Sequence, residues 1–519
     1  MIDVTKKELP EGWQWTTMEH IADVIGGGTP KSKEKIFFDD GEIPWLTPAD
    51  LSGYTAKHIS KGARNITGAG LNSSSAKLMP AGTVLFTSRA PIGYVAIATN
   101  EISTNQGFKS FVLKSEEILP DYVYWWLKGN KQLAESMASG TTFLELSGSK
   151  AKQLPIPISP PEQQKRIVAK IEELFSHIDA GIEALKKAKQ LLKQYRQSVL
   201  KAAVTGELTK EWREANKDKL EFASRLLECI LIERRQKWEE LQLEQFNAKG
   251  NMPKNEKWKE KYKEANGFDA DINIPEEWVG ATTDQVFYYV TSGSRGWAKY
   301  YSEEGPIFLR MGNLEHYDVR LDLEDIQRVN PPFGAEGSRT KVEPGDSLIS
   351  ITADVGMVGI VPVGFEEAYI NQHVALGRPV IREMGLYLAW LLSGDFAKEQ
   401  FKSLQRGATK VGLGLEDIKA IQFGLPSLEE QQLIVNRIQE KLSSIERLNN
   451  IIDKQSLLAK KQKQTILSSA FAGKLVENDY SGESAADLLE RINKERVLLK
   501  SKEKSSKRKF IKKKGNKDG

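Results

Sequence analysis

The chain has few cysteines and histidines and no long apolar run. A single cysteine, Cys229, among 519 residues excludes a disulfide framework and a cysteine-rich metal site, and it fits a reducing cytoplasm. The five histidines are scattered without the spacing of zinc ligands. The N-terminal stretch is polar, and no apolar run reaches the roughly 18 residues that a membrane span needs. We therefore expect a cytoplasmic protein without a signal peptide, a membrane anchor or a metal site.

An excess of one charge is also missing. The 74 Lys and Arg residues nearly balance the 70 Asp and Glu residues, which leaves a formal charge of +4. Any surface for nucleic acid must therefore come from local patches and not from the field of the whole chain. A length of 519 residues exceeds what one core supports, so we expect two or more domains.

The sequence lacks the common catalytic motifs, apart from one segment that resembles part of a methyltransferase site. Residues 330–333 read NPPF, the turn with which N6-adenine and N4-cytosine methyltransferases hold a flipped base. Such an enzyme also needs a glycine-rich cofactor turn that opens a helix, and GGGTP at 26–30 opens none. Gly473-Lys474 is followed by Leu475 and not by the Ser or Thr of a Walker loop. We interpret NPPF as a stiff structural turn and the chain as a binding protein.

The chain contains an internal repeat, which is the most informative pattern present. Asn105-Gln106 matches Asn371-Gln372, and Glu162-Gln163-Gln164 is paired with Glu430-Gln431-Gln432. The longer matches are LPEGWQWTT (9–17) with IPEEWVGAT (274–282), PAGTVLFTSRAPIGYVAI (80–97) with EPGDSLISITADVGMVGI (343–360), SGTTF (139–143) with RGATK (406–410), AAVTGEL (202–208) with SAFAGKL (469–475), and EFASRLLECILIER (221–234) with ESAADLLERINKER (483–496). Two equivalent halves predict a pseudo-two-fold molecule.

Each half consists of a β-rich part followed by one long helix. Short runs rich in Val, Ile, Phe and Thr, bounded by Gly, Pro and Asn, are typical of strands. Prolines 160 and 161 suit a first helical turn, while Gly206 and Gly473 end the two helical patterns. Apolar residues recur at helical spacing at Ile167, Ile171, Leu174, Ile178, Ile182, Leu185, Leu192, Tyr195 and Val199, and again at Ile434, Ile438, Leu442, Ile445, Leu448, Ile452 and Ile466.

At about 40 residues, each helix would be roughly 60 Å long. We predict an α+β fold in which two β-rich domains are separated by these two helices, paired antiparallel as a coiled-coil spacer. The alternative is that each apolar stripe is ordinary helix core.

Two further segments are highly charged. The stretch from 209 to 271 combines charges and aromatic residues, and it is either a solvated linker helix or a docking surface for a partner subunit. Beyond Lys500 the composition cannot bury a core, so we expect a basic disordered tail that attracts nucleic acid nonspecifically.

The combined pattern resembles the specificity subunit of type I restriction-modification systems, over nearly the whole chain. Its most specific marks are LPIPISPPEQQKRIVAKIEELFSHID with FGLPSLEEQQLIVNRIQEKLSSIE, AAVTGELTKEWR with SAFAGKLVEND, and LPEGW with IPEEW. The resemblance implies two target recognition domains that each read one half of an interrupted site in double-stranded DNA. It also implies that the helices dock two methyltransferase subunits, which carry S-adenosylmethionine and modify adenine, and that restriction subunits add ATP- and Mg-dependent translocation and cleavage.

On this interpretation the chain is no enzyme and holds no cofactor of its own. The segment from 207 to 270 is a departure from the compact family pattern, so the sequence does not decide which helices dock the partner subunits. The domains we predict are a first target recognition domain at 1–158, a first spacer helix at 159–206, a charged helical linker at 207–270, a second target recognition domain at 271–425, a second spacer helix at 426–473, and a C-terminal helix with a basic tail at 474–519.

Contacts with DNA require Lys and Arg for phosphates, and Arg, Lys, Asn and Gln for bases, on loops that the strands support. For any one of them, a solvated surface charge is the simpler interpretation. Asn105-Gln106 and Asn371-Gln372 recur in both halves, which favours a structural role in a shared turn. Our candidates are Lys31, Lys33, Arg64, Asn65 and Arg89 in the first domain, and Arg295, Lys299, Arg310, Arg339, Lys341 and Lys410 in the second.

Two other functions remain open from the sequence. The chain could be a helical scaffold that pairs other proteins without reading DNA, or a fused modification enzyme in which NPPF is active. Selection of bound DNA from a random pool distinguishes DNA reading from the scaffold function, because a bipartite motif supports DNA reading and no enrichment supports the scaffold.

Overall fold

The computed structural model describes two compact units. The described residues are 8–89, 91–140, 144–218, 221–293, 295–316, 318–332, 334–404, 412–478 and 482–498. Unit 1 combines residues 1–185 with 453–519, and unit 2 comprises residues 186–452. Across the described residues, none of the helices is both long and apolar enough to cross a membrane.

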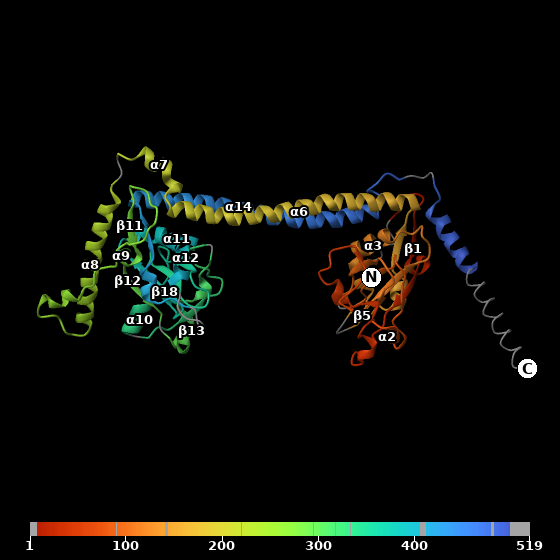
Figure 1. Ribbon diagram of the computed structural model, residues 1–519, viewed down its shortest axis with the longest axis horizontal. Coiled ribbons are helices and arrows are strands. Elements are labelled where there is room, and N and C mark those ends of the chain that lie inside the picture. Colours follow the sequence, from red (N-terminus) through yellow and green to blue (C-terminus); the bar gives the residue numbers. More distant parts are fainter. Residues whose placement is uncertain are drawn as a thin grey trace, which may run out of the picture. The chain divides into compact units, whose positions relative to one another are not determined.

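Two long helices each contribute a segment to both units, and their bounds are Pro161–Val204 for α6 and Leu428–Ala470 for α14 (Figure 1). In unit 1, Ile167 near the start of α6 shares a core with Leu467 near the end of α14. In unit 2, Leu200 near the end of α6 shares a core with Ile438 near the start of α14. The two helices therefore pack antiparallel in each unit, as the apolar periodicity predicts.

Unit 1 builds its β-rich part from three sheets. Their strand orders are β1-β10, β2-β9-β6-β7-β4 and β5-β3-β8. The elements are β1 (Gln14–Thr17), α1 (Met18–Ile21), β2 (Ala22–Gly26), η2 (Lys35–Phe37), β3 (Ile43–Leu46), η3 (Pro48–Leu51), β4 (His58–Ile59), β5 (Arg64–Ile66), α2 (Gly68–Asn72), β6 (Val84–Phe86), β7 (Val95–Ala98), β8 (Ser103–Thr104), β9 (Lys109–Leu113), α3 (Pro120–Gly129), α4 (Lys131–Met137), α5 (Gly148–Lys152) and β10 (Pro155–Ile158).

Unit 2 repeats this arrangement. Its sheets have the orders β11-β19, β12-β18-β15-β16 and β14-β13-β17. The elements are η4 (Glu207–Thr209), α7 (Lys210–Ala215), α8 (Ala223–Ala248), η5 (Glu256–Lys261), β11 (Val279–Thr282), α9 (Thr283–Val286), β12 (Phe287–Ser292), η6 (Trp297–Tyr300), β13 (Tyr301–Leu309), η7 (Met311–Asn313), β14 (Gln327–Val329), α10 (Ala335–Thr340), β15 (Ser347–Ser350), β16 (Val358–Ile360), β17 (Ala368–Ile370), β18 (Val374–Pro379), η8 (Arg382–Met384), α11 (Gly385–Ser393), α12 (Asp395–Leu404), α13 (Leu415–Lys419) and β19 (Gln422–Leu425).

The topology confirms the internal repeat. The order β2-β9-β6-β7 corresponds to β12-β18-β15-β16, and β5-β3-β8 corresponds to β14-β13-β17. Even the strand directions agree, because the pairs β3-β8 and β13-β17 are both parallel while their other neighbours are antiparallel. Among the described residues, β4 adds a strand to the edge of the larger sheet in unit 1, where unit 2 has an isolated bridge between Glu315 and Val358.

Each unit joins its β-rich part to the long helices through one aromatic helix. In unit 1, Tyr122 and Trp126 of α3 pack edge-on against Phe471, just after α14, with ring centroids 5.0 and 5.1 Å apart. In unit 2, Tyr387 and Trp390 of α11 lie in the same core as the start of α14. The large buried rings supply much of the apolar area that fixes each helix pair to its own domain.

One detail of the repeat was aligned wrongly from the sequence. The structure pairs Gln164 with Gln431, since each side-chain amide donates to the backbone carbonyl five residues earlier, at 3.0 and 2.9 Å. Gln163 then corresponds to Glu430, and these two accept the indole N–H of Trp13 and Trp278 at 3.1 and 2.9 Å. The Glu-Gln-Gln triplets are therefore shifted by one residue, because buried hydrogen bonds and not letter identity define equivalent positions.

A further pair of helices packs on the two units. In unit 2, α8 buries Ala223 and Ile230, and in unit 1 the helix at 485–498 buries Ala485 and Ile492. These are matching positions of the repeated segments, so each half carries an equivalent short helix. The tail beyond residue 498 lies outside the described residues.

Candidate DNA-recognition surface

A tight turn organises the candidate surface in both units. A Cβ on Gly27 would lie 2.1 Å from the carbonyl oxygen of Asn105, and one on Gly293 would lie 2.2 Å from that of Asn371, so only glycine fits. Each asparagine side chain accepts the backbone N–H two residues later, at 2.8 and 3.1 Å. The two asparagines thus hold the same turn in both units, which is the structural role that their recurrence predicts.

The loops that leave these glycines carry four of the predicted cations. Lys31 and Lys33 are exposed in the loop after β2, and Arg295 and Lys299 are exposed at the equivalent place after β12. Next to them, Trp297 is buried and stacks on Phe308, with ring centroids 5.5 Å apart. A buried anchor beneath exposed cations gives a loop that can hold charges in a defined position.

Strand β5 presents two further candidates in different ways. The Arg64 guanidinium lies 4.2 Å from the centroid of the Phe38 ring, which positions the charge while leaving the residue exposed. The amide nitrogen of Asn65 donates to the carbonyl of Gly41 at 3.0 Å. Arg64 is therefore available to an outside partner, whereas the Asn65 side chain already supports a turn.

Arg89 lies between β6 and β7. Its Nη1 is 3.4 Å from Glu145, which also lies 3.6 Å from Lys109. At the matching place in unit 2, Thr352 contacts the His373 ring at 2.6 Å. The two units therefore place different side chains at the same position of the repeated scaffold.

Of the candidates in unit 2, Arg310 and Arg339 are both engaged within the protein. Arg310 pairs with Asp325 at 2.8 Å. Arg339 donates to the Thr291 hydroxyl at 2.8 Å and to the Ser292 carbonyl at 2.7 Å. Arg339 therefore ties α10 to β12. Lys410 lies outside the described residues.

Lys341 is exposed but rests on a rigid support. Its ammonium is 3.4 Å from Glu367, whose pKa is lowered by a hydrogen bond from Tyr369. Burial and the contact with Glu367 raise the pKa of the Tyr369 hydroxyl to about 12. The Lys341 carbonyl accepts Arg378 Nη2 at 3.0 Å. This network holds the backbone of Lys341 in place.

The Arg378 guanidinium is itself fixed from below. It makes two hydrogen bonds with the buried Asp346, at 2.8 and 2.9 Å. Burial raises the pKa of Asp346, although Arg378 acts in the opposite direction. A bidentate pair of this kind gives geometric rigidity beneath the loop at Lys341.

Three polar side chains outside the candidate list lie near the Gly-Asn turns: Gln106 and Gln372, to which the sequence analysis assigned a structural role, and Lys109, which it did not consider. Gln106 is hydrogen-bonded to Thr29, and Gln372 lies 3.0 Å from the ring of His373. Lys109 stands beside Glu145. The repeat could have pointed to the two glutamines. Each follows an asparagine with a structural role, but the contacts of the glutamines differ between the units.

The NPPF segment connects β14 to α10. Asn330 is exposed, and its backbone N–H donates to the Tyr300 carbonyl at 2.9 Å, as in a turn that returns to the sheet. Phe333 lies outside the described residues. Within the described part of the chain, no group of three or more His, Cys, Asp or Glu side chains is arranged to hold a metal ion.

Comparison with known proteins identifies the family. The family model described as type I restriction modification DNA specificity domain matches residues 10–192 and 335–456, more than half of the chain. The chain belongs to the type I restriction-modification DNA specificity family. As a specificity subunit it is a non-catalytic protein that provides DNA sequence specificity, so NPPF is not the active turn of a fused enzyme.

Several specificity subunits are similar to the chain. The MjaIX specificity subunit of Methanocaldococcus jannaschii is 40% identical over 190 residues, which cover 36% of this chain and 42% of that protein. The EcoBI specificity subunit of Escherichia coli is 26% identical over 78% of each protein. The EcoKI specificity subunit of Escherichia coli K12 is 23% identical over 96% of this chain and 99% of that protein.

Solved structures show the same fold. A chain from a study of complex assembly and conformational transition of the type I R-M system matches with a TM-score of 0.58 and 18% identity, and covers 90% of this chain and 99% of that one. The HsdS subunit from Thermoanaerobacter tengcongensis matches with a TM-score of 0.52 over the same shares. The predicted α+β fold class is confirmed by these likenesses.

Proposed function

We propose that this specificity subunit reads a bipartite DNA site, one half-site for each unit, and directs adenine methylation and restriction by partner subunits. The observation that carries the proposal is a repeated scaffold with different exposed side chains. Gly27 and Gly293 make the same turn, yet Lys31 and Lys33 follow the first while Arg295 and Lys299 follow the second. Identical supports with different functional groups suit two readers of different sequences.

The chemistry of the candidates fits a division of labour. Lys31, Lys33 and Lys299 are exposed point charges suited to phosphates, which position the protein. Arg64 offers a planar guanidinium suited to the O6 and N7 acceptors of guanine, and its contact with Phe38 limits the entropy lost on binding. Arg310 would have to break its ion pair with Asp325 before its guanidinium could contact DNA.

The partner subunits would dock on the long helices. A groove of about 960 Å³ in unit 2 is lined by α6 and α14 on one side and by the β-rich domain on the other. Three buried polar atoms on side chains that line it have no hydrogen-bond partner among the described residues: Arg196 Nε, Trp390 Nε1 and Asn449 Oδ1. Burial lowers the pKa of Arg196. Buried polar groups normally have partners, so these atoms support a protein surface that completes the groove.

S-adenosylmethionine, ATP and Mg would be bound by the methyltransferase and restriction subunits. The specificity subunit would contribute the choice of sequence and the alignment of two methyltransferase subunits. Its C-terminal basic tail, outside the described residues, would add nonspecific attraction to DNA.

Selection from random duplex DNA, with sequencing of the bound fraction, tests the proposal. We expect the chain together with methyltransferase subunits to enrich two short motifs separated by a fixed gap. A variant with Arg64→Gln and Lys31→Gln should lose preference in one motif, while Arg295→Gln with Lys299→Gln should affect only the other. No enrichment with the wild-type chain would support the scaffold alternative, and loss of both motifs in either variant would contradict independent readers.

A further inference from the structure

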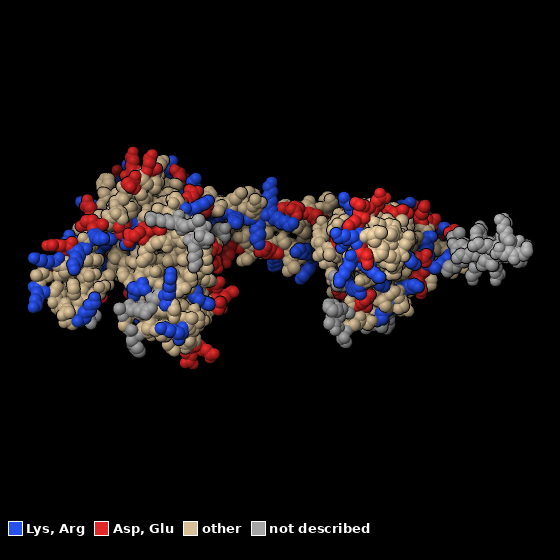
Figure 2. Space-filling view, turned by 60° about the horizontal axis from the view of Figure 1, so that its bottom comes forward, with Lys and Arg blue, Asp and Glu red and all other residues tan. Residues whose placement is uncertain are grey.

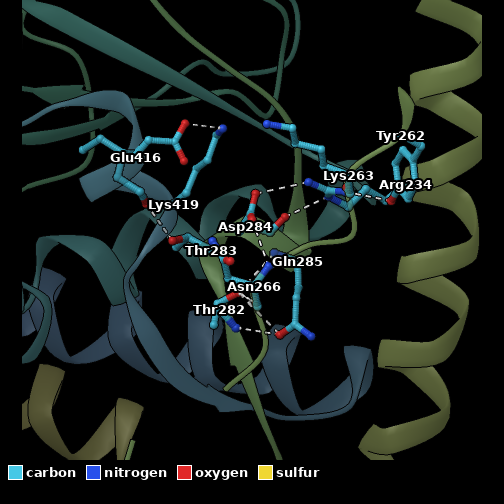
Figure 3. Close-up of polar contacts among 11 residues, drawn as sticks. Arg234, Tyr262, Lys263, Asn266, Thr282, Thr283, Asp284, Gln285, Glu416 and Lys419 are labelled. Carbon is cyan, nitrogen blue, oxygen red and sulfur yellow. Dashed lines mark hydrogen bonds and ion pairs between the residues drawn. The ribbon is translucent and has the colours of Figure 1, made fainter. Parts of the chain in front are cut away.

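The charged linker between the two halves folds into an appendage on unit 2, which we define as α8 together with the return segment 249–264. Arg234 of α8 anchors it, because its Nη2 pairs with Asp284 at 3.1 Å and its Nε donates to the Asp284 carbonyl at 2.8 Å (Figure 3). Arg234 Nη1 also donates to the Tyr262 hydroxyl at 2.7 Å. One arginine therefore joins α8, the return segment and the β-rich domain.

The appendage has an aromatic core of its own. Trp238 stacks on Trp258 with ring centroids 6.0 Å apart and contacts Tyr262 at 5.3 Å. Phe246 contacts Trp258 edge-on at 5.8 Å. Four large rings that meet in this way hold the return segment against α8, so the segment is an ordered element and not a solvated linker.

Among the described residues of unit 1, no segment corresponding to the return segment lies beside the equivalent helix. That helix ends at residue 498 within the described part of the chain, and the matching residues of α8 end near Arg234. Within the described part of the chain, the aromatic core and the return segment are therefore found in unit 2 and not in unit 1.

The return segment is rich in lysines, and most of them make no ion pair with any residue that the structure describes. It contains six lysines against three glutamates. Among the described residues, only Lys259 of these six makes an ion pair, with Glu239 at 3.4 Å and Glu256 at 3.0 Å. The other five, all exposed, are Lys249, Lys254, Lys257, Lys261 and Lys263.

The appendage points toward the candidate DNA-recognition surface of unit 2. In Figure 1, α8 extends from the end of the unit that carries α7 toward the end that carries α10 and β13. Figure 2 turns that lower end forward and shows Lys and Arg side chains on the appendage and on the neighbouring surface of the unit. Residues 249–264 begin at the C-terminal end of α8, the end farthest from α7, and run back along the helix to Tyr262, which contacts Arg234.

We propose that the lysines of the return segment bind backbone phosphates of duplex DNA beside the half-site that unit 2 reads. The inference rests on the proposed function of that unit. Lysine is a flexible point charge suited to phosphate contacts that carry no sequence information. The appendage would thus extend the footprint of unit 2 beyond its recognised bases and raise affinity without changing specificity.

The salt dependence of binding tests this with the full chain. We compare the wild type with a triple variant, Lys254→Gln, Lys257→Gln and Lys261→Gln, on a random duplex and on the selected site. Each lost phosphate contact should lower the slope of log K against log salt by about 0.9, so the variant should lose about 2 to 3 units of slope. Extending the duplex by about ten base pairs beyond the second half-site should strengthen wild-type binding and leave the variant unaffected.

A matched control removes three exposed lysines of unit 2 elsewhere, with Lys201→Gln, Lys210→Gln and Lys402→Gln. It should keep most of the slope and the response to longer DNA. An unchanged slope in the test variant would overturn the inference, and its loss of methyltransferase assembly at unchanged slope would assign the lysines to an acidic protein surface instead. Failure of this inference can be distinguished from failure of the proposed function. If the proposed function failed, the wild type would select no site, while the comparison on random duplex would still report the lysine contacts.

Discussion

The buried ion pair between Arg213 and Glu430 provides a sharp test of how unit 2 is held together. Glu430 has 1% of its side chain exposed, and its Oε1 accepts Arg213 Nη1 at 2.6 Å. Trp278 Nε1 donates to its other oxygen at 2.9 Å. The pair joins the start of α14 to the segment after α6 and to the start of the β-rich domain, so it stabilises the point where three elements meet.

We expect Arg213→Met to destabilise unit 2 by about 3 to 5 kcal/mol, because it leaves a buried carboxylate without its cation. Glu430→Gln should cost less, because Arg213 keeps a second acidic neighbour, Glu277, at 3.4 Å. The double variant should cost about 2 kcal/mol or less, since a buried ion pair can be replaced by neutral groups at small cost. Gln163, a neutral residue at the equivalent position of unit 1, already accepts the Trp13 indole in this way.

The assay is hydrogen exchange of the full chain in increasing urea, read separately for peptides from 428–442 and from 161–175. The second range belongs to unit 1 and serves as an internal control that should not change. The coupling free energy between the two substitutions should be at least about 1 kcal/mol. Additive effects, or a loss below about 1 kcal/mol for Arg213→Met, would show that the pair does not stabilise the junction.

Three other predictions concern the helices and the domains. Four residues inserted near Lys189 would add about 6 Å and rotate the rest of α6 by roughly 40°, close to the roughly 35° by which one base pair turns the duplex. We therefore expect site selection to return unchanged half-sites separated by a gap that is longer by about one base pair. An unchanged gap at full affinity would show that the helices do not set the spacing. Exchanging residues 1–155 for the domain of a relative should change one selected half-site, and a change in both would contradict modular reading. Gly206→Ala should destabilise unit 2 by about 1 to 3 kcal/mol, because φ is +78° and the new Cβ would lie 2.4 Å from a proline ring. Gly181→Ala is the control, because the new Cβ would lie in open space on α6. We expect it to stabilise the protein by up to about 1 kcal/mol in thermal unfolding, so the reasoning would be refuted if both substitutions changed stability in the same direction.

The sequence by itself determined the internal repeat, the two long helices and the family. These features are visible because helix periodicity, prolines near helix starts and glycines after helix ends are local patterns. The duplication adds a second copy against which each pattern can be checked. The α+β class followed from the same signals, since strand-rich runs and one helical stripe recur in order in both halves.

Only the tertiary structure decided which residues are truly equivalent and which candidate side chains are already occupied. The register of Gln163 and Glu430 depends on indole donors about 150 residues away in the chain. Whether Asn65 faces outward depends on the carbonyl of Gly41, and the order of residues 249–264 depends on Trp238 meeting Trp258. Such contacts join segments that no local pattern relates, because hydrogen bonds and ring packing act through space while periodicity acts along the chain.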